Sequence, residues 1–445
     1  KNKLMKRIIL TLFVILNSGL VTAQDVQTRK LDALFDKVVA LDKAMGSVSV
    51  FKNGTEIYQR SFGYADIENK ILATEKTKYK IGSISKMYTA TLILKLVEDE
   101  QLKLNTKLNK FFPEIPNAHQ ITIKNLLNHS SGLFNYTENK DFYEWAIVEH
   151  TKEDIIQKII ENGIIFQPNS THKYSNTNFV LLAFIVEKLH NKPFKQVLKT
   201  EILEPLNLKD TQIGGKIKIS NNESYSYEKN NKWEVYPTWF MDNAIGAGSL
   251  IATPTDVNRF TNALYTHKLL KKKFVDKMLK LTKYYGLGVF SYRFFSKTFF
   301  GHGGSLEKFR AITAYSFVDD FSITVSLNGP VIEVQDIVKA VLAVYQNKTY
   351  GLPELHVVEL KNTEVIEGLY SGEGYPYKIK IFKKDDHLMA QRTGQDPFQI
   401  DAISDTEFKI EHLKLNFTFS PEDNRLEFVQ DNRGYILYKE KTDNF

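Results

Sequence analysis

Apolar residues along the chain are spaced as strands first, then as helices, then as strands again. Alternating runs over residues 47–51 and 55–62 flank Asn53-Gly54, a pair that favours the positive φ angles of a tight hairpin turn. Further strands are expected over residues 299–304, 311–317 and 322–328. Helical spacing is found over residues 32–41, 87–97, 121–127, 178–189 and 334–345. This order predicts an α+β fold in which an antiparallel sheet is flanked by helices.

The pattern changes around residues 350–362, where Gly351 and Pro353 indicate a linker. Short strand-like runs follow at residues 377–382, 387–391, 397–400, 408–412, 415–419, 425–430 and 435–438. Their regular spacing predicts a small C-terminal all-β domain over residues 363–445, an antiparallel barrel or sandwich. No catalytic constellation stands out in it, so we expect it to stabilise the protein or form a rim rather than bind a partner.

The N-terminus has the pattern of a secretory signal peptide over residues 1–23. Lys6-Arg7 precede a short apolar run over residues 8–16, and small residues lead to Ala23, after which cleavage is expected. The apolar run is too short to span a bilayer. Met5 is the expected start of translation. The sequence therefore predicts an exported protein, periplasmic or secreted, with no membrane span in its mature part and a first domain over residues 24–349.

Charge and cysteine content exclude several classes of function. The formal net charge is +7, but Lys1, Lys3, Lys6 and Arg7 supply four of these charges, which leaves +3 after export. With no basic stripe interleaved with aromatic residues, nucleic acid is not an expected partner. The chain has no cysteine, which excludes a cysteine nucleophile, disulfides and thiolate metal sites. The histidines show no metal-ligand spacing, so neither a metal nor another cofactor is expected.

Ser83 and Lys86 are the first candidate for chemistry. Their spacing places a hydroxyl and an amine on the same side of one helical turn, at the start of an apolar helix. A lysine in a closed pocket loses its charge and can then accept the proton of the serine. Taken alone, the same spacing also fits a serine that caps a helix and a solvated lysine.

Two later motifs, Tyr174-Ser175-Asn176 and His302-Gly303-Gly304-Ser305, follow in the same order as in a known superfamily. With Ser83-x-x-Lys86 they resemble the penicillin-recognising serine hydrolases: class C β-lactamases, DD-peptidases, D-aminopeptidases and β-lactamase-fold esterases. Segments 121–133, 246–256 and 285–289 are also similar to that superfamily. The resemblance covers roughly residues 30 to 345 and implies the β-lactamase/DD-peptidase fold.

The resemblance implies a role for each motif residue. Ser83 would be the nucleophile, Lys86 would hold or accept its proton, and Tyr174 would be the partner base and the acid for the leaving group. We expect Tyr174 to be a phenolate between two positive neighbours, Lys86 and His302. Asn176 would hydrogen-bond the substrate amide and Lys86.

The third motif would bind substrate through His302 and the strand that follows it. Gly303 and Gly304 would let the strand approach the substrate closely, and the N–H groups of Ser305 and Ser83 would form an oxyanion hole. β-Lactamases of this type usually carry lysine at the position of His302. A histidine there resembles the motif of DD-peptidases, D-aminopeptidases and related esterases. Arg310 is left outside the site, and His129 with Ser130 is expected to organise a loop.

The sequence therefore predicts an exported serine hydrolase that forms an acyl-enzyme on Ser83. A peptidase or amidase for D-amino-acid-containing or cell-wall-related peptides ranks first, a small-ester carboxylesterase second and a β-lactamase third. A catalytically silent peptidoglycan-binding protein is the alternative of another class, and the intact motif set argues against it. The expected partner is a small-molecule or peptide substrate, and the oligomeric state stays open.

Overall fold

The computed structural model describes residues 26–230, 232–350, 352, 363–384, 387–402, 404, 406–410, 415–430 and 433–441. These residues belong to two compact units. The first consists of the chain up to Tyr227 together with Val235–Lys348, and the second of Glu228–Glu234 and Thr349–Phe445. The predicted signal peptide lies outside the described residues. Of the predicted linker, only residues 350 and 352 are described.

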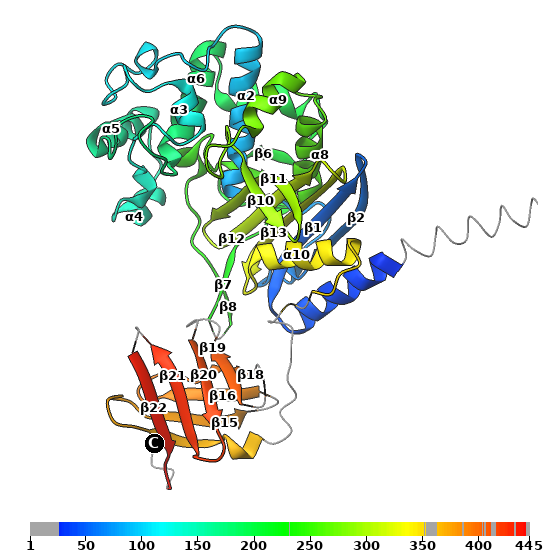
Figure 1. Cartoon of the computed structure of the whole chain (residues 1–445), viewed down its shortest axis with the longest axis vertical. Coiled ribbons are helices and arrows are strands. Elements are labelled where there is room, and N and C mark those ends of the chain that lie inside the picture. The colour runs from blue at the N-terminus through cyan, green and yellow to red at the C-terminus, as the bar shows by residue number, and fades with distance from the viewer. Residues whose placement is uncertain are drawn as a thin grey trace, which may run out of the picture. The chain divides into compact units, whose positions relative to one another are not determined.

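A six-stranded antiparallel sheet, in the order β10-β11-β12-β13-β1-β2, is the centre of the first unit (Figure 1). Its strands are β1 (Ala44–Lys52), β2 (Thr55–Phe62), β10 (Phe290–Phe294), β11 (Lys297–Leu306), β12 (Phe309–Ser316) and β13 (Phe321–Pro330). The hairpin turn between β1 and β2 is at Asn53 and Gly54, with φ angles of 51° and 74°. The antiparallel pairing of β1 with β2 confirms the predicted hairpin. Asparagine and glycine tolerate these positive φ angles, which is why the turn forms here. Strand β10 was not predicted.

Helices pack on this sheet and form a separate layer above it. They are α2 (Ser85–Glu98), α3 (Ile123–Leu127), α4 (Phe142–Ala146), α5 (Lys152–Asn162), α6 (Asn176–His190), α7 (Phe194–Leu198), α8 (Pro254–Tyr265), α9 (Lys272–Leu279), α10 (Val334–Tyr345) and a helix over residues 26–40. Strand β13 is buried from Phe321 to Gly329, which requires cover on both faces; α8 and α10 both pack against it. The predicted α+β fold is confirmed.

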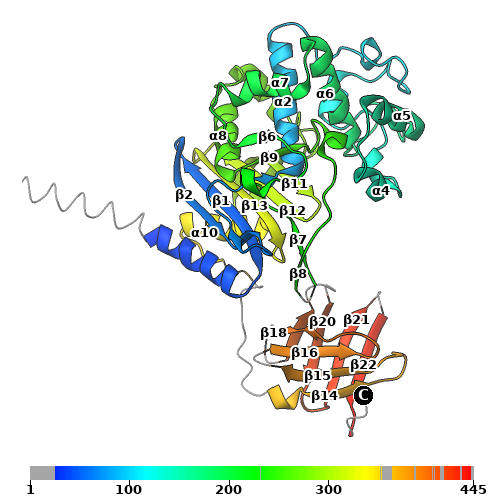
Figure 2. The ribbon, with the colours of Figure 1, turned by 180° about the vertical axis from the view of Figure 1, so that it is seen from behind.

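Helix α2 is buried on all sides, from Ser85 to Leu94. It lies between α6 and α8 in both views (Figures 1 and 2), with the ring of Tyr88 stacked on that of Phe260 in α8. Helix α6 is buried from Thr177 to Val186 and packs against α2. A mostly apolar sequence with no polar face explains this position, because such a helix is stable only inside a protein. Helix α2 therefore forms the core between the sheet and the other helices.

Four helices differ from the prediction at their N-terminal ends: the helix over residues 26–40, α2, α3 and α6. Helix α3 begins at Ile123 because Thr122 caps it: the hydroxyl of Thr122 accepts the N–H of Asn125, and the Asn125 side chain bonds back to Thr122. Helix α6 begins at Asn176, two residues earlier than predicted. This places Asn176 in the first turn of α6. By contrast, α10 has the predicted bounds, Val334–Tyr345.

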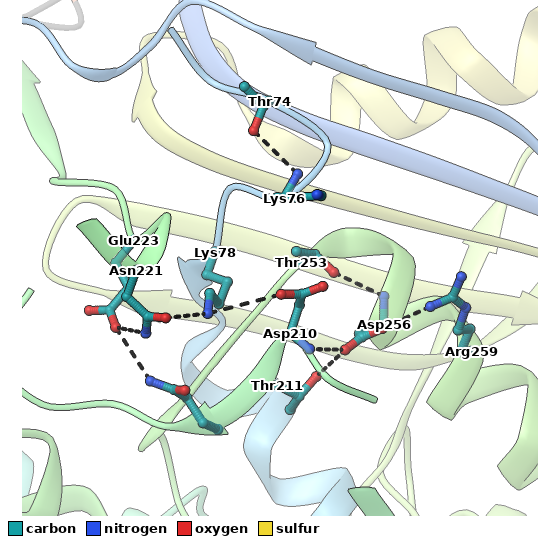
Figure 3. A network of polar contacts seen from close by, with 11 residues as sticks. Thr74, Lys76, Lys78, Asp210, Thr211, Asn221, Glu223, Thr253, Asp256 and Arg259 are labelled. Atoms are coloured by element: carbon teal, nitrogen blue, oxygen red, sulfur yellow. Dashed lines mark hydrogen bonds and ion pairs between the residues drawn. The ribbon is translucent and has the colours of Figure 1, made fainter. Parts of the chain in front are cut away.

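A small three-stranded sheet contains β5, the strand that directly precedes the turn carrying Ser83. Its order is β5-β9-β6, from β5 (Tyr79–Lys80), β9 (Leu250–Ala252) and β6 (Thr211–Ile213). Beside it, Lys78 Nζ donates to Asn221 Oδ1 at 3.1 Å, and Asp256 in α8 accepts the backbone N–H of Asp210 at 2.8 Å (Figure 3). These polar contacts fix the chain that leads into Ser83. Two short hairpins are also present: β3 (Tyr64–Asp66) pairs with β4 (Ile71–Leu72) in the first unit, and β7 (Tyr227–Lys229) pairs with β8 (Trp233–Val235), most of which is assigned to the second unit.

The second unit is a curved antiparallel sheet in the order β17-β16-β15-β14-β22-β21-β20-β19-β18. The strands are β14 (Gly368–Ser371), β15 (Ile379–Lys384), β16 (His387–Arg392), β17 (Phe398–Gln399), β18 (Asp401–Ala402), β19 (Glu407–Ile410), β20 (Leu415–Ser420), β21 (Arg425–Gln430) and β22 (Arg433–Lys439). The two outermost strands, β17 and β18, are separated only by Ile400, so the chain itself joins the sheet's edges. Its core is aromatic and aliphatic, including Tyr370, Phe408 and Leu437. The predicted C-terminal all-β fold is confirmed, although β14 and β18 were not predicted.

No helix within the described ranges is long and apolar enough to cross a membrane.

Replacing Phe35 by Ala tests how the helix over residues 26–40 holds the sheet. The ring of Phe35 is fully buried, with its centroid 4.8 Å from that of Phe62 and 6.3 Å from that of Tyr58. We expect the free energy of unfolding to fall by about 3 to 5 kcal/mol, since the change leaves a cavity. Urea denaturation of the full chain, followed by tryptophan fluorescence, measures it. The control Val39→Ala, on the exposed face of the same helix, should cost less than about 0.5 kcal/mol, and equal losses in both variants would contradict this packing.

Candidate active site

Ser83 lies in a 3₁₀ turn, Gly82–Ile84, that runs directly into α2. The turn contacts β11, and the two backbones are very close there. A Cβ at Gly82 would lie 2.8 Å from the nitrogen of Ser305, and one at Gly304 would lie 1.9 Å from the carbonyl oxygen of Ile81. Only glycine fits at both positions. The segments that carry the two predicted oxyanion-hole N–H groups therefore lie against each other.

Lys86 is fully buried, and its amine has three polar neighbours. Lys86 Nζ is 2.9 Å from Ser83 Oγ, 2.7 Å from Asn176 Oδ1 and 2.6 Å from the carbonyl oxygen of Ala247. None of these groups carries a charge that would hold an ammonium. Burial consequently lowers the pKa of Lys86 well below its ordinary value.

An uncharged amine, the form that burial favours, has two N–H bonds and one lone pair. The carbonyl of Ala247 and the amide oxygen of Asn176 can only accept hydrogen bonds, so they take the two N–H groups. The lone pair then faces Ser83 Oγ, whose hydroxyl can donate its proton. This is the arrangement that a general base for Ser83 requires.

Tyr174 lines the same pocket as Ser83, and the serine hydroxyl is near enough to oppose part of the effect of burial on the pKa of Tyr174. Its ring centroid lies 4.9 Å from Lys86 Nζ. Burial raises the pKa of Tyr174 above its ordinary value, so the side chain is a neutral phenol. The predicted phenolate between two positive neighbours is therefore wrong for the free protein, because burial removes the charge from both neighbours.

His302 is 1% exposed and uncharged. Its Nδ1–H donates to the carbonyl of Gly303 at 2.6 Å, so Nε2 is the acceptor of the Tyr285 hydroxyl at 3.1 Å. Burial is the main cause that lowers the pKa of His302, to about 3. The prediction that His302 supplies positive charge is wrong. Its ring instead packs beside Phe290, with centroids 4.8 Å apart.

Asn176 is held from a loop that the sequence analysis did not single out. Its Nδ2 donates to Thr137 Oγ1 at 2.9 Å, and its backbone N–H donates to Asn135 Oδ1 at 2.9 Å. Both contacts leave Asn176 Oδ1 free to accept from Lys86. Because these partners lie about forty residues away in the sequence, no local spacing could have indicated them.

The predicted residues line one open pocket of about 500 Å³. Ser83, Tyr174, Asn176, His302, Gly304 and Ser305 all contribute to it. Phe290, Tyr292, Ile312, Val334 and Gln335, which the sequence analysis missed, complete much of its wall. Lys86 lies beneath the pocket rather than on its surface. None of the residues that line the pocket carries a formal charge, since His302 is neutral.

His129 supports the site from behind. It is buried, its Nδ1 accepts the N–H of Ser175 at 3.2 Å and an Asn178 N–H at 3.1 Å, and its ring lies 4.3 Å from that of Tyr174. Ser130 donates to Asn128 and accepts from Asn125 within the same loop. These contacts agree with the predicted structural role. Arg310 donates to the carbonyls of Glu307 and Phe309 and does not line the pocket.

Within the part of the chain that the structure describes, no three His, Asp or Glu side chains are grouped to hold a metal ion.

A family model described as Beta-lactamase matches residues 31–353, well over half of the chain. The chain belongs to the Beta-lactamase family of serine hydrolases. The resemblance seen in the sequence is thereby confirmed.

Individual relatives agree with this family. The chain is similar to the solved structure of D-amino acid amidase from Ochrobactrum anthropi SV3 complexed with D-phenylalanine, with a TM-score of 0.66 and 25% identity, over 72% of this chain and 99% of that one. An octameric penicillin-binding protein homologue from Pyrococcus abyssi shares the fold, with a TM-score of 0.65 and 22% identity, over 93% of this chain and 98% of that one. Among curated proteins, teichoic acid D-alanine hydrolase from Staphylococcus aureus is 28% identical over 246 residues, which is 55% of this chain and 60% of the relative. The chain thus spans less than two thirds of that relative's length.

In this member of the Beta-lactamase family, the protonation states predict the pH dependence of catalysis. The reactive form needs an uncharged Lys86, so kcat/KM should rise with pH as the ammonium loses its proton, with a midpoint well below about 10.4. The rate should fall again only above about pH 10, where the raised pKa of Tyr174 is approached. Initial rates measured across this range give the profile.

The same profile tests His302. With a pKa of about 3, His302 contributes no step near its ordinary value, and His302→Gln should keep the midpoint of the wild-type protein. A step near pH 6.5 that disappears in His302→Gln would show instead that this histidine titrates during the reaction.

Proposed function

We propose that the protein is an exported serine hydrolase that forms an acyl-enzyme on Ser83 and cleaves amide or ester bonds of D-amino-acid-containing substrates. The observation that carries the proposal is the fully buried amine of Lys86, which lies 2.9 Å from Ser83 Oγ beneath an open pocket. Burying a lysine without a counter-charge is costly and contributes nothing to a purely binding role. This argues against the catalytically silent peptidoglycan-binding alternative.

The reaction follows from the contacts around Ser83. Lys86 Nζ takes the hydroxyl proton while Ser83 Oγ bonds to the substrate's carbonyl carbon. The carbonyl oxygen gains the negative charge, which the N–H groups of Ser83 and Ser305 stabilise. When the intermediate collapses, the Tyr174 hydroxyl gives its proton to the leaving amine or alcohol, and the Lys86 ammonium returns one to Tyr174. Water then hydrolyses the acyl-enzyme by the same steps in reverse.

The substrate class is supported by the pocket and by the relatives. The likeness to D-amino acid amidase and to teichoic acid D-alanine hydrolase favours D-amino acids joined by amide or ester bonds. The aromatic wall formed by Phe290 and Tyr292 suits an apolar acyl side chain. His302 stands where related β-lactamases carry lysine, so β-lactam hydrolysis ranks below amide and ester hydrolysis.

Export rests on the predicted signal peptide over residues 1–23, and a role outside the cell fits the cell-wall substrate named for the Staphylococcus aureus relative.

Replacing Ser83 by Ala tests the nucleophile. The purified chain from residue 24 onward and the variant are compared on a D-amino-acid amide, its L-enantiomer, a chromogenic short-chain ester and a chromogenic cephalosporin. We expect Ser83→Ala to abolish turnover of every substrate while the far-ultraviolet circular dichroism stays unchanged. Turnover that survives in Ser83→Ala would rule out the acyl-enzyme, and equal rates on the D- and L-amides would rule out the proposed stereochemistry.

Lys86→Ala and Tyr174→Phe test the two proton-transfer groups separately. Each should lower the rate of acylation by about 10²- to 10⁴-fold, since each removes a group that moves a proton in this step. Single-turnover kinetics with the preferred ester or amide measure the rate. Acylation at the wild-type rate in either variant would remove that residue from the mechanism.

A further inference from the structure

A buried ion pair joins the chain in front of Ser83 to the chain behind Ser305. Lys80 Nζ lies 2.5 Å from Glu307 Oε1, and the side chains are 2% and 0% exposed. Lys80 ends β5, three residues before Ser83, and Glu307 directly follows β11, two residues after Ser305. The two residues are 227 positions apart in the sequence.

A buried ion pair of this kind is not needed for the stability of the fold alone. Two charges lose their hydration when they are buried, and apolar residues of similar size often stabilise a protein equally well. Glu307 also has a φ angle of 52°, a left-handed conformation that a glutamate seldom adopts. The side chain is held there by further contacts, because Oε1 accepts the backbone N–H of Trp239 at 2.7 Å and Oε2 accepts the Ser226 hydroxyl at 3.4 Å. The chain therefore maintains a strained turn and two desolvated charges at one place.

Ser83 follows Lys80 in the chain and Ser305 precedes Glu307. The negative charge of the proposed reaction would develop at the backbone N–H groups of these two serines. The positions of Gly82 and Gly304 allow the two segments to approach so closely that a single Cβ would collide with the facing backbone. Van der Waals contact limits how near the segments come, but it does not prevent them from separating or sliding. The Lys80–Glu307 ion pair joins both segments within three residues of Ser83 and Ser305. Such a pair would oppose their separation and sliding.

We propose that the Lys80–Glu307 ion pair is a positioning element that sets the separation of the Ser83 and Ser305 N–H groups in the oxyanion hole. This inference rests on the proposed acyl-enzyme mechanism. Hydrogen bonds to a developing oxyanion depend steeply on donor position, so a small displacement lowers the acylation rate without removing any reacting group. Neither Lys80 nor Glu307 lines the pocket.

The test uses a matched ester and thionoester, in which sulfur replaces the carbonyl oxygen. Sulfur accepts hydrogen bonds weakly, so the thionoester draws less on the oxyanion hole. In Lys80→Met and in Glu307→Gln we expect kcat/KM for the ester to fall about tenfold or more. The thionoester should change much less, so the ratio of the two rates should fall. The double variant should be no slower than the slower single variant, because the two residues act as one unit.

Lys78→Met is the matched control. Lys78 lies on the same stretch of chain and is also buried, but it bonds to Asn221 at 3.1 Å and lies 4.0 Å from Asp210, on the side of the 210–223 segment (Figure 3). It makes no contact of this kind with β11. We expect it to lower stability in urea while the ester-to-thionoester ratio stays within about twofold of the wild type.

The outcomes separate the possible explanations. A normal ratio in both Lys80→Met and Glu307→Gln, together with lower stability, would overturn the inference and leave a purely structural ion pair. If Lys80→Met does not fold, Glu307→Gln decides, because it keeps the shape of the side chain and an acceptor for Trp239. Wild-type protein with no Ser83-dependent ester turnover would instead refute the proposed function, and this inference would fall with it.

Discussion

The removal of the Lys86 amine from water is the constraint on which the site depends. Helix α2 is apolar enough to lie inside the protein, between α6 and α8, and it takes Lys86 with it. The surroundings offer hydrogen-bond acceptors but no counter-charge, which drives the amine to its uncharged form. A feature of the hydrophobic core thereby determines the acid–base chemistry at Ser83. The neutral states of Tyr174 and His302 have the same origin, since both lie in the same desolvated region.

The second constraint is the close approach of two backbones. The turn that carries Ser83 and the strand that carries Ser305 can meet only because glycine occupies positions 82 and 304. Steric fit brings the segments together, and the Lys80–Glu307 pair joins them. Preorganised N–H donors stabilise a developing oxyanion only when their positions are fixed before the reaction. In the proposed mechanism the core would therefore tune the base, and the strand contact would shape the oxyanion hole.

Features encoded in neighbouring residues could be predicted from the sequence. The Asn53-Gly54 pair predicted the β1–β2 hairpin because the positive φ angles of the turn are a property of these two residues. The bounds of α10 were predicted correctly because one face of this helix is apolar along its length. The Ser83-x-x-Lys86 spacing likewise placed the two groups together through one helical turn. Strands β14 and β18 were missed because four-residue and two-residue strands carry too little periodicity.

Features that depend on distant parts of the chain could not be predicted. The charge of His302 is set by burial against Phe290 and Tyr285, which no spacing rule around residue 302 reveals. The carbonyl of Ala247 binds Lys86 through its backbone, so its side chain gives no signal. Lys80 and Glu307 belong to no motif, and only the folded chain brings them together. Protonation state, positioning and the residues of the pocket wall therefore require the structure, whereas the motif residues could be named from the sequence.

The ionisation of Lys86 is the most direct test of this account. Lysine labelled with ¹³C at Cε gives one signal per residue, and the Lys86 signal is the one that disappears in Lys86→Met. Its chemical shift, followed as a function of pH in the free protein, gives the pKa of the amine. We expect a midpoint well below the ordinary value of about 10.4. A midpoint at or above that value would mean that Lys86 is an ammonium in the resting protein and would contradict its role as the base for Ser83.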